Sequence, residues 1–248
     1  MTDYPGRVVG IQIHGADPWT SPWGSDRWKF YDLASVPGVA IDGTTALISG
    51  PLSYEKIAAA VNLRLSHPTD VSLDLYGKQI APRTYRMTAR LALDADAPPR
   101  IVRVHMASLL YVYPFIGAYY YHNCVRDGAD VDTIELLPGE PRIVEHEFQF
   151  NDDSWKAKER IRIAAWTQEP QAAAPAGVHQ AAITRWPFTD LHPCPADVNG
   201  DAAVDVRDLE EILQSWGDCP WCHTDLNGDK TVDHLDLLQV IAAWGACR

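Results

Sequence analysis

Residues 197–248 contain one sequence pattern twice, and this duplication constrains the fold more than any other feature of the chain. Asp197 in the first copy corresponds to Asp225 in the second, an offset of 28 residues that all matched positions keep. The flanking residues repeat as well, for example Trp216 and Trp244. Such close agreement indicates an internal duplication of a loop followed by a helix.

Each copy carries oxygen donors at the spacing of an EF-hand loop. Counting the first Asp as position 1, Asp or Asn occupies positions 1, 3, 5, 9 and 12, and position 7 offers a backbone carbonyl. Calcium is a hard cation that binds six to eight oxygens, so the pattern predicts two calcium ions. The predicted ligands are Asp197, Asn199, Asp201, Ala203, Asp205 and Asp208, and then Asp225, Asn227, Asp229, Thr231, Asp233 and Asp236.

Apolar residues at helical spacing follow each loop, which predicts loop–helix twice. Gly217 and Gly245 lie where these helices are expected to end. Val204 and Val232, at position 8, are expected to pair across the two loops and to bury their side chains. The apolar residues of the two helices are Leu209, Ile212, Leu213 and Trp216, and then Leu237, Leu238, Ile241 and Trp244.

The duplicated pattern Asp-x-Asn-x-Asp-x-x-Val-Asp-x-x-Asp-Leu resembles the type I dockerin family over residues 194–248. This resemblance implies two bound calcium ions and docking onto a cohesin-like or cell-surface partner, often in polysaccharide degradation. Position 6, often Gly in the family, is Ala202 or Lys230 here. Positions 10 and 11, often Ser-Thr, are Val206-Arg207 and His234-Leu235. The alternative is that calcium only folds this segment and no partner docks on it.

Charge and cysteine content also set the C-terminal segment apart. Residues 194–248 hold eleven Asp and Glu against three Lys and Arg, which is −8 of the net charge of −12. No region is basic enough to suggest nucleic-acid binding. Four of the five cysteines lie in this segment, and the fifth, Cys124, is expected to be a buried thiol.

The duplication favours the disulfides Cys194–Cys219 and Cys222–Cys247, because each pair has the same separation. The alternative is a redox Cys-x-x-Cys motif formed by Cys219 and Cys222. Disulfides and calcium both indicate a location outside the cytoplasm, which is extracellular, periplasmic or at the cell surface. No apolar run reaches the about 18 residues of a membrane span. Residues 1–6 lack a signal-peptide pattern, so we expect an N-terminal segment to be missing.

The N-terminal residues predict a strand at 7–14, an aromatic-rich helix at about 25–34, a hairpin at Asp42-Gly43 and a helix from Ser53 to about Leu65. This order matches the last two-thirds of a thioredoxin fold. The sequence of this segment resembles the thioredoxin-related outer-membrane protein family. The matching residues are Asp17-Pro18-Trp19, Arg27, Tyr31, Val36-Pro37, Asp42-Gly43 and Tyr54. The resemblance implies a cis proline at Pro37 facing redox cysteines, but the segment that carries those cysteines has no counterpart here.

From His67 onward the hydrophobic period changes to two, which predicts a β-sandwich. Turns are expected at Ala97-Pro98-Pro99, Arg126-Asp127-Gly128 and Leu137-Pro138-Gly139-Glu140. Members of the outer-membrane family have a β-sandwich at the same place in the chain. The motifs His122-Asn123 and Ala165-Trp166-Thr167-Gln168 resemble motifs of that family. The aromatic residues of 111–121 fit a sugar- or peptide-binding face, and they fit a sandwich core or a domain interface equally well. They are Tyr111, Tyr113, Phe115, Tyr119, Tyr120 and Tyr121.

Together these patterns predict a multidomain α+β protein. The expected parts are an incomplete thioredoxin-like domain (1–66), a β-sandwich (67–186), a linker (187–193) and a small all-α dockerin-like domain (194–248). His14 with Asp17 is the most suggestive polar pair, and it is interpreted as a loop hydrogen bond. We therefore expect a secreted or cell-surface, non-catalytic protein with two calcium ions. The alternative is an extracytoplasmic thioredoxin-fold oxidoreductase or thiol chaperone whose redox segment is missing.

Overall fold

A computed structural model describes most of the chain, and the protein it shows is α+β, mainly β-sheet with a few helices. The described residues are 4, 7–14, 20–32, 38–43, 46–49, 53–111, 113–114, 120–188, 194–198, 203–218, 224–227, 229 and 231–246. None of the helices in this described part combines the length and apolar character needed to cross a membrane.

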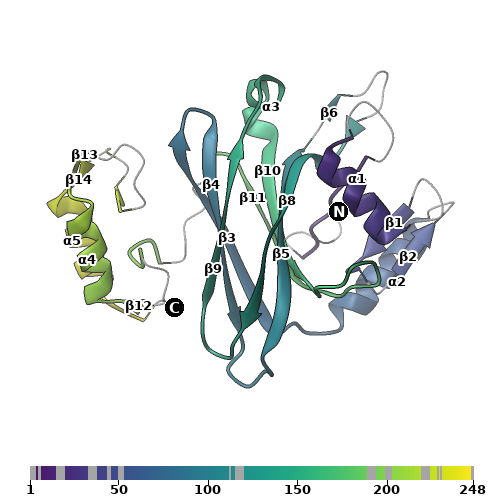
Figure 1. The fold of residues 1–248 in the computed structure, drawn as a ribbon, viewed down its shortest axis with the longest axis horizontal. Helices are drawn as coiled ribbons and strands as arrows, with labels where there is room; N and C mark the ends of the chain where they lie inside the picture. The colour runs from purple at the N-terminus through teal and green to yellow at the C-terminus, as the bar shows by residue number, and fades with distance from the viewer. Residues whose placement is uncertain are drawn as a thin grey trace.

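Two antiparallel sheets form a sandwich, as the alternating pattern predicts (Figure 1). The first sheet has the order β3 (Val71–Ala81), β4 (Thr84–Leu93) and β9 (Arg142–Gln149). The second has the order β11 (Val178–Arg185), β10 (Ile161–Gln168), β5 (Arg100–Leu110) and β8 (Cys124–Leu136). Smaller elements are α3 (Asp152–Lys156), a 3-10 helix (Lys158–Arg160), β6 (Tyr113–Pro114) and β7 (Tyr120–Tyr121).

The sandwich core lies between the facing sides of the sheets, where Met87, Leu91 and Met106 are fully buried. Phe188 is also fully buried there, with its ring centroid 5.1 Å from that of Tyr85 and 6.0 Å from that of Phe150. Phe188 was expected to belong to the linker, but its ring is part of the sandwich core.

The outer side of the four-stranded sheet is covered by N-terminal residues. Helix α1 (Pro22–Tyr31) begins three residues earlier than expected because Ser21 caps it, accepting a 3.0 Å hydrogen bond from the Gly24 amide. Asp32 ends the helix in the left-handed region, with φ 41°. Trp23 of α1 packs on Trp166 of β10, with ring centroids 5.8 Å apart.

Residues 7–14 do not form the strand expected from their sequence. Only Gln12 makes a parallel bridge, to Cys124 at the start of β8, through bonds of 3.0 Å to the Asn123 carbonyl and from the Val125 amide. Alternate residues Val9, Ile11 and Ile13 pack against the four-stranded sheet. The apolar character of this segment thus serves the outer layer of the sandwich.

The hairpin and helix expected next are present as β1 (Gly38–Ile41), β2 (Ala46–Ser49) and α2 (Tyr54–Leu65). The hairpin turns at Asp42 and Gly43, both with positive φ, and Ser53 caps α2. It joins the sandwich through the Asp42 carbonyl, which accepts a 2.9 Å bond from the Val178 amide. Pro37 and Asp17-Pro18-Trp19 lie outside the described residues.

The turn expected at Arg126-Asp127-Gly128 is wrong, because these residues lie inside β8. Gly128 pairs with Ala107 of β5, and two register shifts nearby let the long strand bend. The glycine serves close packing instead of a turn, since a Cβ there would meet the Trp23 indole.

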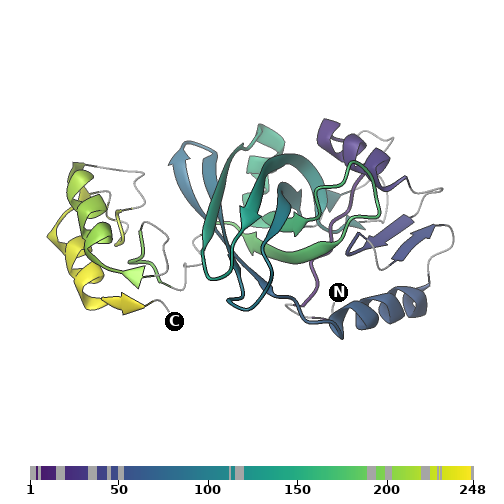
Figure 2. The ribbon, with the colours of Figure 1, turned by 60° about the horizontal axis from the view of Figure 1, so that its bottom comes forward.

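The C-terminal module, residues 194–248, contains loop and helix twice, as its repeat predicts. Its elements are β12 (Ala203–Val204), α4 (Val206–Gln214), β13 (Gly217–Asp218), β14 (Thr231–Val232), α5 (His234–Ala242) and β15 (Gly245–Ala246). Its helices lie on one side of the sandwich, and α1, β1, β2 and α2 lie on the other (Figures 1 and 2).

Val204 and Val232 are fully buried, as expected, but their backbones do not pair with each other. Val204 pairs with Gly245 and Val232 pairs with Gly217. The strand β12 of the first loop therefore pairs with β15, which follows the second helix, and β14 of the second loop pairs with β13, which follows the first helix. Because each repeat supplies a strand to the other, neither repeat can complete its strand pairing alone.

Candidate metal loops and a polar cavity

Positions 9 and 12 of each loop cap the helix that follows. Asp205 accepts a 2.8 Å bond from the Arg207 amide, and Asp208 accepts a 2.8 Å bond from the Asp205 amide. In the second repeat Asp236 likewise accepts a 2.9 Å bond from the Asp233 amide. These reciprocal bonds are capping boxes, so the four aspartates have a structural role that the sequence analysis did not assign.

Asp236 also closes the second loop. Its Oδ1 accepts bonds of 2.8 Å and 3.2 Å from the Leu226 and Asn227 amides, at positions 2 and 3. Asn227 Oδ1 accepts from the Asp229 amide at 2.8 Å, and Asp229 Oδ1 accepts from the Thr231 amide at 2.9 Å. Chain reversal at positions 3 and 5 therefore relies on the same polar side chains that were predicted as ligands.

The donor chemistry of the loops suits calcium, since every predicted side-chain ligand offers oxygen. The arrangement is less complete. Over the described residues, no group of three or more His, Cys, Asp or Glu side chains gathers in a way that could hold a metal ion. Asn199 and Asp201 of the first loop lie outside the described residues. The structure thus brings Asp236 to the start of its loop without collecting the other carboxylates around one point.

The loops face strand β3 of the sandwich. Burial lowers the pKa of Lys78 to about 8, and the negative charges of Asp225 and Asp236 oppose this shift. Burial raises the pKa of Tyr76 to about 12, and the charge of Asp197 contributes in the same direction. Carboxylates of both loops are therefore close enough to β3 to influence its side chains.

Cys194 is disulfide-bonded and buried at the start of the C-terminal module. Cys219, Cys222 and Cys247 all lie outside the described residues, so the cysteine bonded to Cys194 does as well. Cys124 is fully buried at the start of β8. That location agrees with the expectation of a buried thiol.

The two helices of the module leave large apolar side chains in contact with solvent. Leu213 and its repeat mate Ile241 are 57% and 50% exposed, and Trp216 and Trp244 are 51% and 53% exposed. The core is formed by the neighbouring Ile212 and Val240 and their contacts. The exposed apolar face consists of Val206, Leu213, Trp216, Leu235, Leu238, Ile241 and Trp244.

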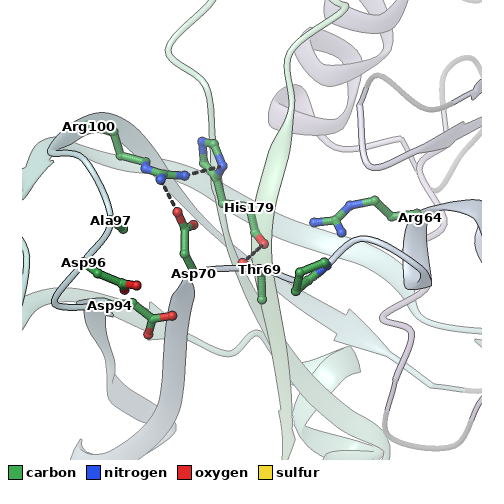
Figure 3. Close-up of a pocket in the computed structure, with 9 residues that line it drawn as sticks. Arg64, Thr69, Asp70, Asp94, Asp96, Ala97, Arg100 and His179 are labelled. Carbon is green, nitrogen blue, oxygen red and sulfur yellow. Dashed lines mark hydrogen bonds and ion pairs between the residues drawn. The ribbon is translucent and has the colours of Figure 1, made fainter.

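A cavity of about 520 Å³ lies between the end of α2 and the sandwich (Figure 3). Arg100 pairs with Asp70, and its Nη1 lies 3.5 Å from His179 Nδ1. Arg64 is directed toward the hairpin, where it pairs with Asp42. The lining residues are Arg64, Pro68, Thr69, Asp70, Asp94, Asp96, Ala97, Arg100 and His179.

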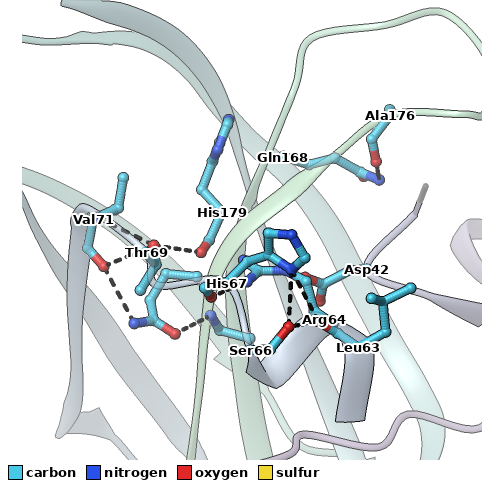
Figure 4. Close-up of polar contacts among 12 residues, drawn as sticks. Asp42, Leu63, Arg64, Ser66, His67, Thr69, Val71, Gln168, Ala176 and His179 are labelled. Carbon is cyan, nitrogen blue, oxygen red and sulfur yellow. Dashed lines mark hydrogen bonds and ion pairs between the residues drawn. The ribbon is translucent and has the colours of Figure 1, made fainter. Parts of the chain in front are cut away.

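Polar contacts around this cavity hold α2 against the sandwich (Figure 4). Thr69 Oγ1 donates a 2.7 Å bond to the His179 carbonyl, and Arg64 Nη1 donates a 2.7 Å bond to the His67 carbonyl. Burial raises the pKa of Asp42, and Arg64 opposes that shift. Burial and Arg100 lower the pKa of His179. The described lining residues include carboxylates, arginines and a histidine, so the cavity is polar.

His14 and Tyr111, which were noted as candidate site residues in the sequence, pack against neighbouring side chains. His14 is buried edge-on against the Tyr121 ring, with centroids 4.4 Å apart, while Asp17 lies outside the described residues. Tyr111 lies beneath the Arg162 guanidinium at 3.7 Å and beside His122 at 5.3 Å. For Tyr111 and Tyr121 these are packing contacts, while Phe115 and Tyr119 lie outside the described residues.

No known protein family matches this sequence, and no curated protein sequence matches it. Among solved structures, HBP35 of Porphyromonas gingivalis aligns with TM-score 0.50 and 15% identity, over 68% of this chain and 59% of HBP35. A domain of the outer membrane lipoprotein Omp28 from Porphyromonas gingivalis aligns with TM-score 0.33, 10% identity, 48% of this chain and 89% of that domain. The chain thus spans 59% of HBP35, and that likeness shows a shared fold.

Proposed function

We propose that this is a non-catalytic protein from outside the cytoplasm whose C-terminal module binds two calcium ions and docks onto a partner protein. The observation that carries the proposal is the exposed apolar face of α4 and α5. Monomeric soluble proteins seldom expose contiguous apolar surface without a binding role. Tryptophan is also enriched among the residues that dominate binding energy at interfaces.

The repeat supports docking because it places equivalent apolar residues on both helices. Val206 and Leu213 are seven residues apart on α4, so they lie on one side of the helix. Leu235, Leu238 and Ile241 follow each other at intervals of three on α5. Positions 10 and 11 of the loops, which the dockerin resemblance assigns to partner recognition, contribute directly to this face. An apolar pocket on a cohesin-like module is the partner that fits it.

Calcium is supported by charge as well as by spacing. The module carries eleven acidic against three basic residues, and Asp208 and Asp236 are fully buried. Buried carboxylates need compensating charge, and backbone amides supply only part of it. A hard divalent cation bound by the loop oxygens would supply the rest. Because Asp208 and Asp236 also cap the helices, ion binding would stabilise α4 and α5 together with the loops.

The disulfide at Cys194 supports a location outside the cytoplasm, since such bonds persist in oxidising compartments. No observation on the described residues supports the alternative that the protein is an oxidoreductase. Cys124 is buried and Cys219 and Cys222 lie outside those residues.

The proposal is tested by measuring binding of the full chain to purified type I cohesin modules with calcium and with a calcium chelator. We expect binding in calcium only, and a loss of at least tenfold in affinity for the double substitution Trp216→Ala, Trp244→Ala. Tyr54→Ala is the matched control, because Tyr54 is 61% exposed on α2 and is not part of the exposed apolar face. An affinity for cohesin that is unchanged by the two tryptophan substitutions, or no binding in calcium, would contradict docking through this face.

A further inference from the structure

A second cavity, of about 310 Å³, lies beside helix α1 on the outer side of the four-stranded sheet. Its walls combine aromatic rings with charged groups. The rings are those of Trp23 and Phe30. The full set of lining residues is Trp23, Asp26, Arg27, Lys29, Phe30, Arg103, Asp130 and Ala172. This cavity is at the N-terminal end of the protein and shares no residue with the calcium loops or the exposed apolar face.

Arg27 is the central charged group of the cavity. Its side chain is only 3% exposed and stands 4.2 Å above the centroid of the Phe30 ring. Nη2 donates a 2.7 Å bond to Gln168 Oε1 and a 2.9 Å bond to the Tyr31 hydroxyl. These contacts fix the plane of the guanidinium. They leave Nε buried without any hydrogen-bond partner, and no carboxylate of the described residues forms an ion pair with Arg27.

The neighbouring acids are already engaged. Asp130 Oδ1 accepts a 2.9 Å bond from Trp23 Nε1 and lies 2.8 Å from His105 Nδ1. The hydrogen bond from His105, with help from Trp23, lowers the pKa of Asp130 and keeps it ionised. Asp26 pairs at 3.2 Å with Lys29 on the solvent side. Neither carboxylate therefore takes the free donor of Arg27.

Arg103 supplies a second unpaired cation. It lies on β5, and its side chain makes no hydrogen bond or ion pair with another described residue. Three cations and two carboxylates line the cavity, which leaves one positive charge in a chain of net charge −12. A buried guanidinium without a counter-ion is unusual, because buried charges are normally paired.

We propose that this cavity binds a small organic anion with one carboxylate and a flat apolar body. The carboxylate would accept from the guanidinium groups of Arg27 and Arg103, which match carboxylate geometry. The apolar body would lie against the aromatic wall of the cavity, which Trp23 and Phe30 provide. A single carboxylate matches the one surplus positive charge. A phosphate, with its larger charge and three acceptor oxygens, would need more donors than the cavity offers.

The test is calorimetric titration of benzoate into the full chain, with neutral benzamide as the isosteric control. We expect saturable binding of benzoate and none of benzamide. Arg103→Gln should weaken benzoate binding at least tenfold, and Arg27→Lys should do the same by replacing the planar fork. Arg142→Gln is the matched control, because Arg142 is exposed on β9 of the other sheet, and it should bind benzoate like the wild type.

Three results would overturn the proposal. One is no binding of benzoate to the wild-type chain, and another is equal affinity in the wild type and Arg103→Gln. The third is inorganic phosphate binding at Arg103 in place of benzoate. Arg27 is buried, so its variant is read only after circular dichroism shows the native fold. Arg103 is partly exposed and keeps the test decisive if the Arg27 variant unfolds.

Discussion

Gly128 of β8 lies directly beneath the indole of Trp23, so that a Cβ at residue 128 would come within 2.5 Å of Trp23 Cδ2 and Cε3. This close approach lets helix α1 settle on the sheet, where Trp23 also reaches Asp130 and Trp166. The absence of a side chain at one strand position thus determines how the N-terminal layer is seated.

Gly128→Ala should therefore destabilise the protein. We expect a loss of about 1–3 kcal/mol in the free energy of unfolding, because an added methyl group overpacks the contact with Trp23. Chemical denaturation measures it. In a Trp23→Leu background, which makes room, Gly128→Ala should cost clearly less. An equal cost in both backgrounds would show that the clash is not with Trp23.

Phe188→Ala should destabilise the sandwich strongly, although Phe188 lies in a segment expected to be linker. Removing a fully buried aromatic ring costs about 3–5 kcal/mol. Tyr54→Ala, at an exposed site, should stay within about 0.5 kcal/mol of the wild type. Denaturant unfolding of the full chain measures both. A Phe188→Ala variant as stable as the control would place Phe188 outside the core.

The free energy of unfolding should fall as the pH is lowered below 6.5. Burial lowers the pKa of His105, and burial lowers those of His146 and His179 as well. The unfolded chain then binds more protons than the folded protein in this range, so acid favours unfolding. Asp130 adds stability that persists until the pH falls through its own lowered pKa.

Replacing His105 isolates its share of this dependence. Stability curves between pH 7 and pH 5 should be flatter for His105→Asn than for the wild type. His122→Asn, at an exposed position, should keep the wild-type slope. A His105→Asn slope identical to the wild type would mean that the pKa of His105 is the same in the folded and unfolded states.

Mass mapping of the disulfides should identify Cys194–Cys219 and Cys222–Cys247. The repeat places each pair at the same separation, and Cys194 is already seen to be bonded. Cys124 should react with a thiol reagent only after unfolding, because it is buried. A Cys219–Cys222 bond would instead favour redox use of the segment.

Periodicity predicted the strands that have one buried side. Alternate residues of β4 and β9 face the core, so their pattern is visible in the sequence. Strand β8 was missed because Arg126-Asp127-Gly128 has the composition of a turn. Its glycine leaves room for the Trp23 indole, which lies more than a hundred residues away in the chain. A local sequence pattern cannot predict such a distant contact.

The candidate sites divide in the same way. Repeat spacing located the loop oxygens, because those residues are neighbours in sequence. Helical spacing could not distinguish Ile212, which is buried, from Leu213, which is exposed, because only the packing of α4 on α5 selects between them. The cavity beside α1 left no sequence signal, since Arg27 and Arg103 come from separate elements.

Calcium binding by the C-terminal module can be measured by calorimetric titration of calcium into the chelator-treated full chain. We expect two sites for the wild type and one for Asp229→Ala, which removes position 5 of the second loop. Asp218→Ala, an exposed acid outside both loops, should keep two sites. Absence of binding at millimolar calcium, or two unchanged sites in Asp229→Ala, would contradict this expectation.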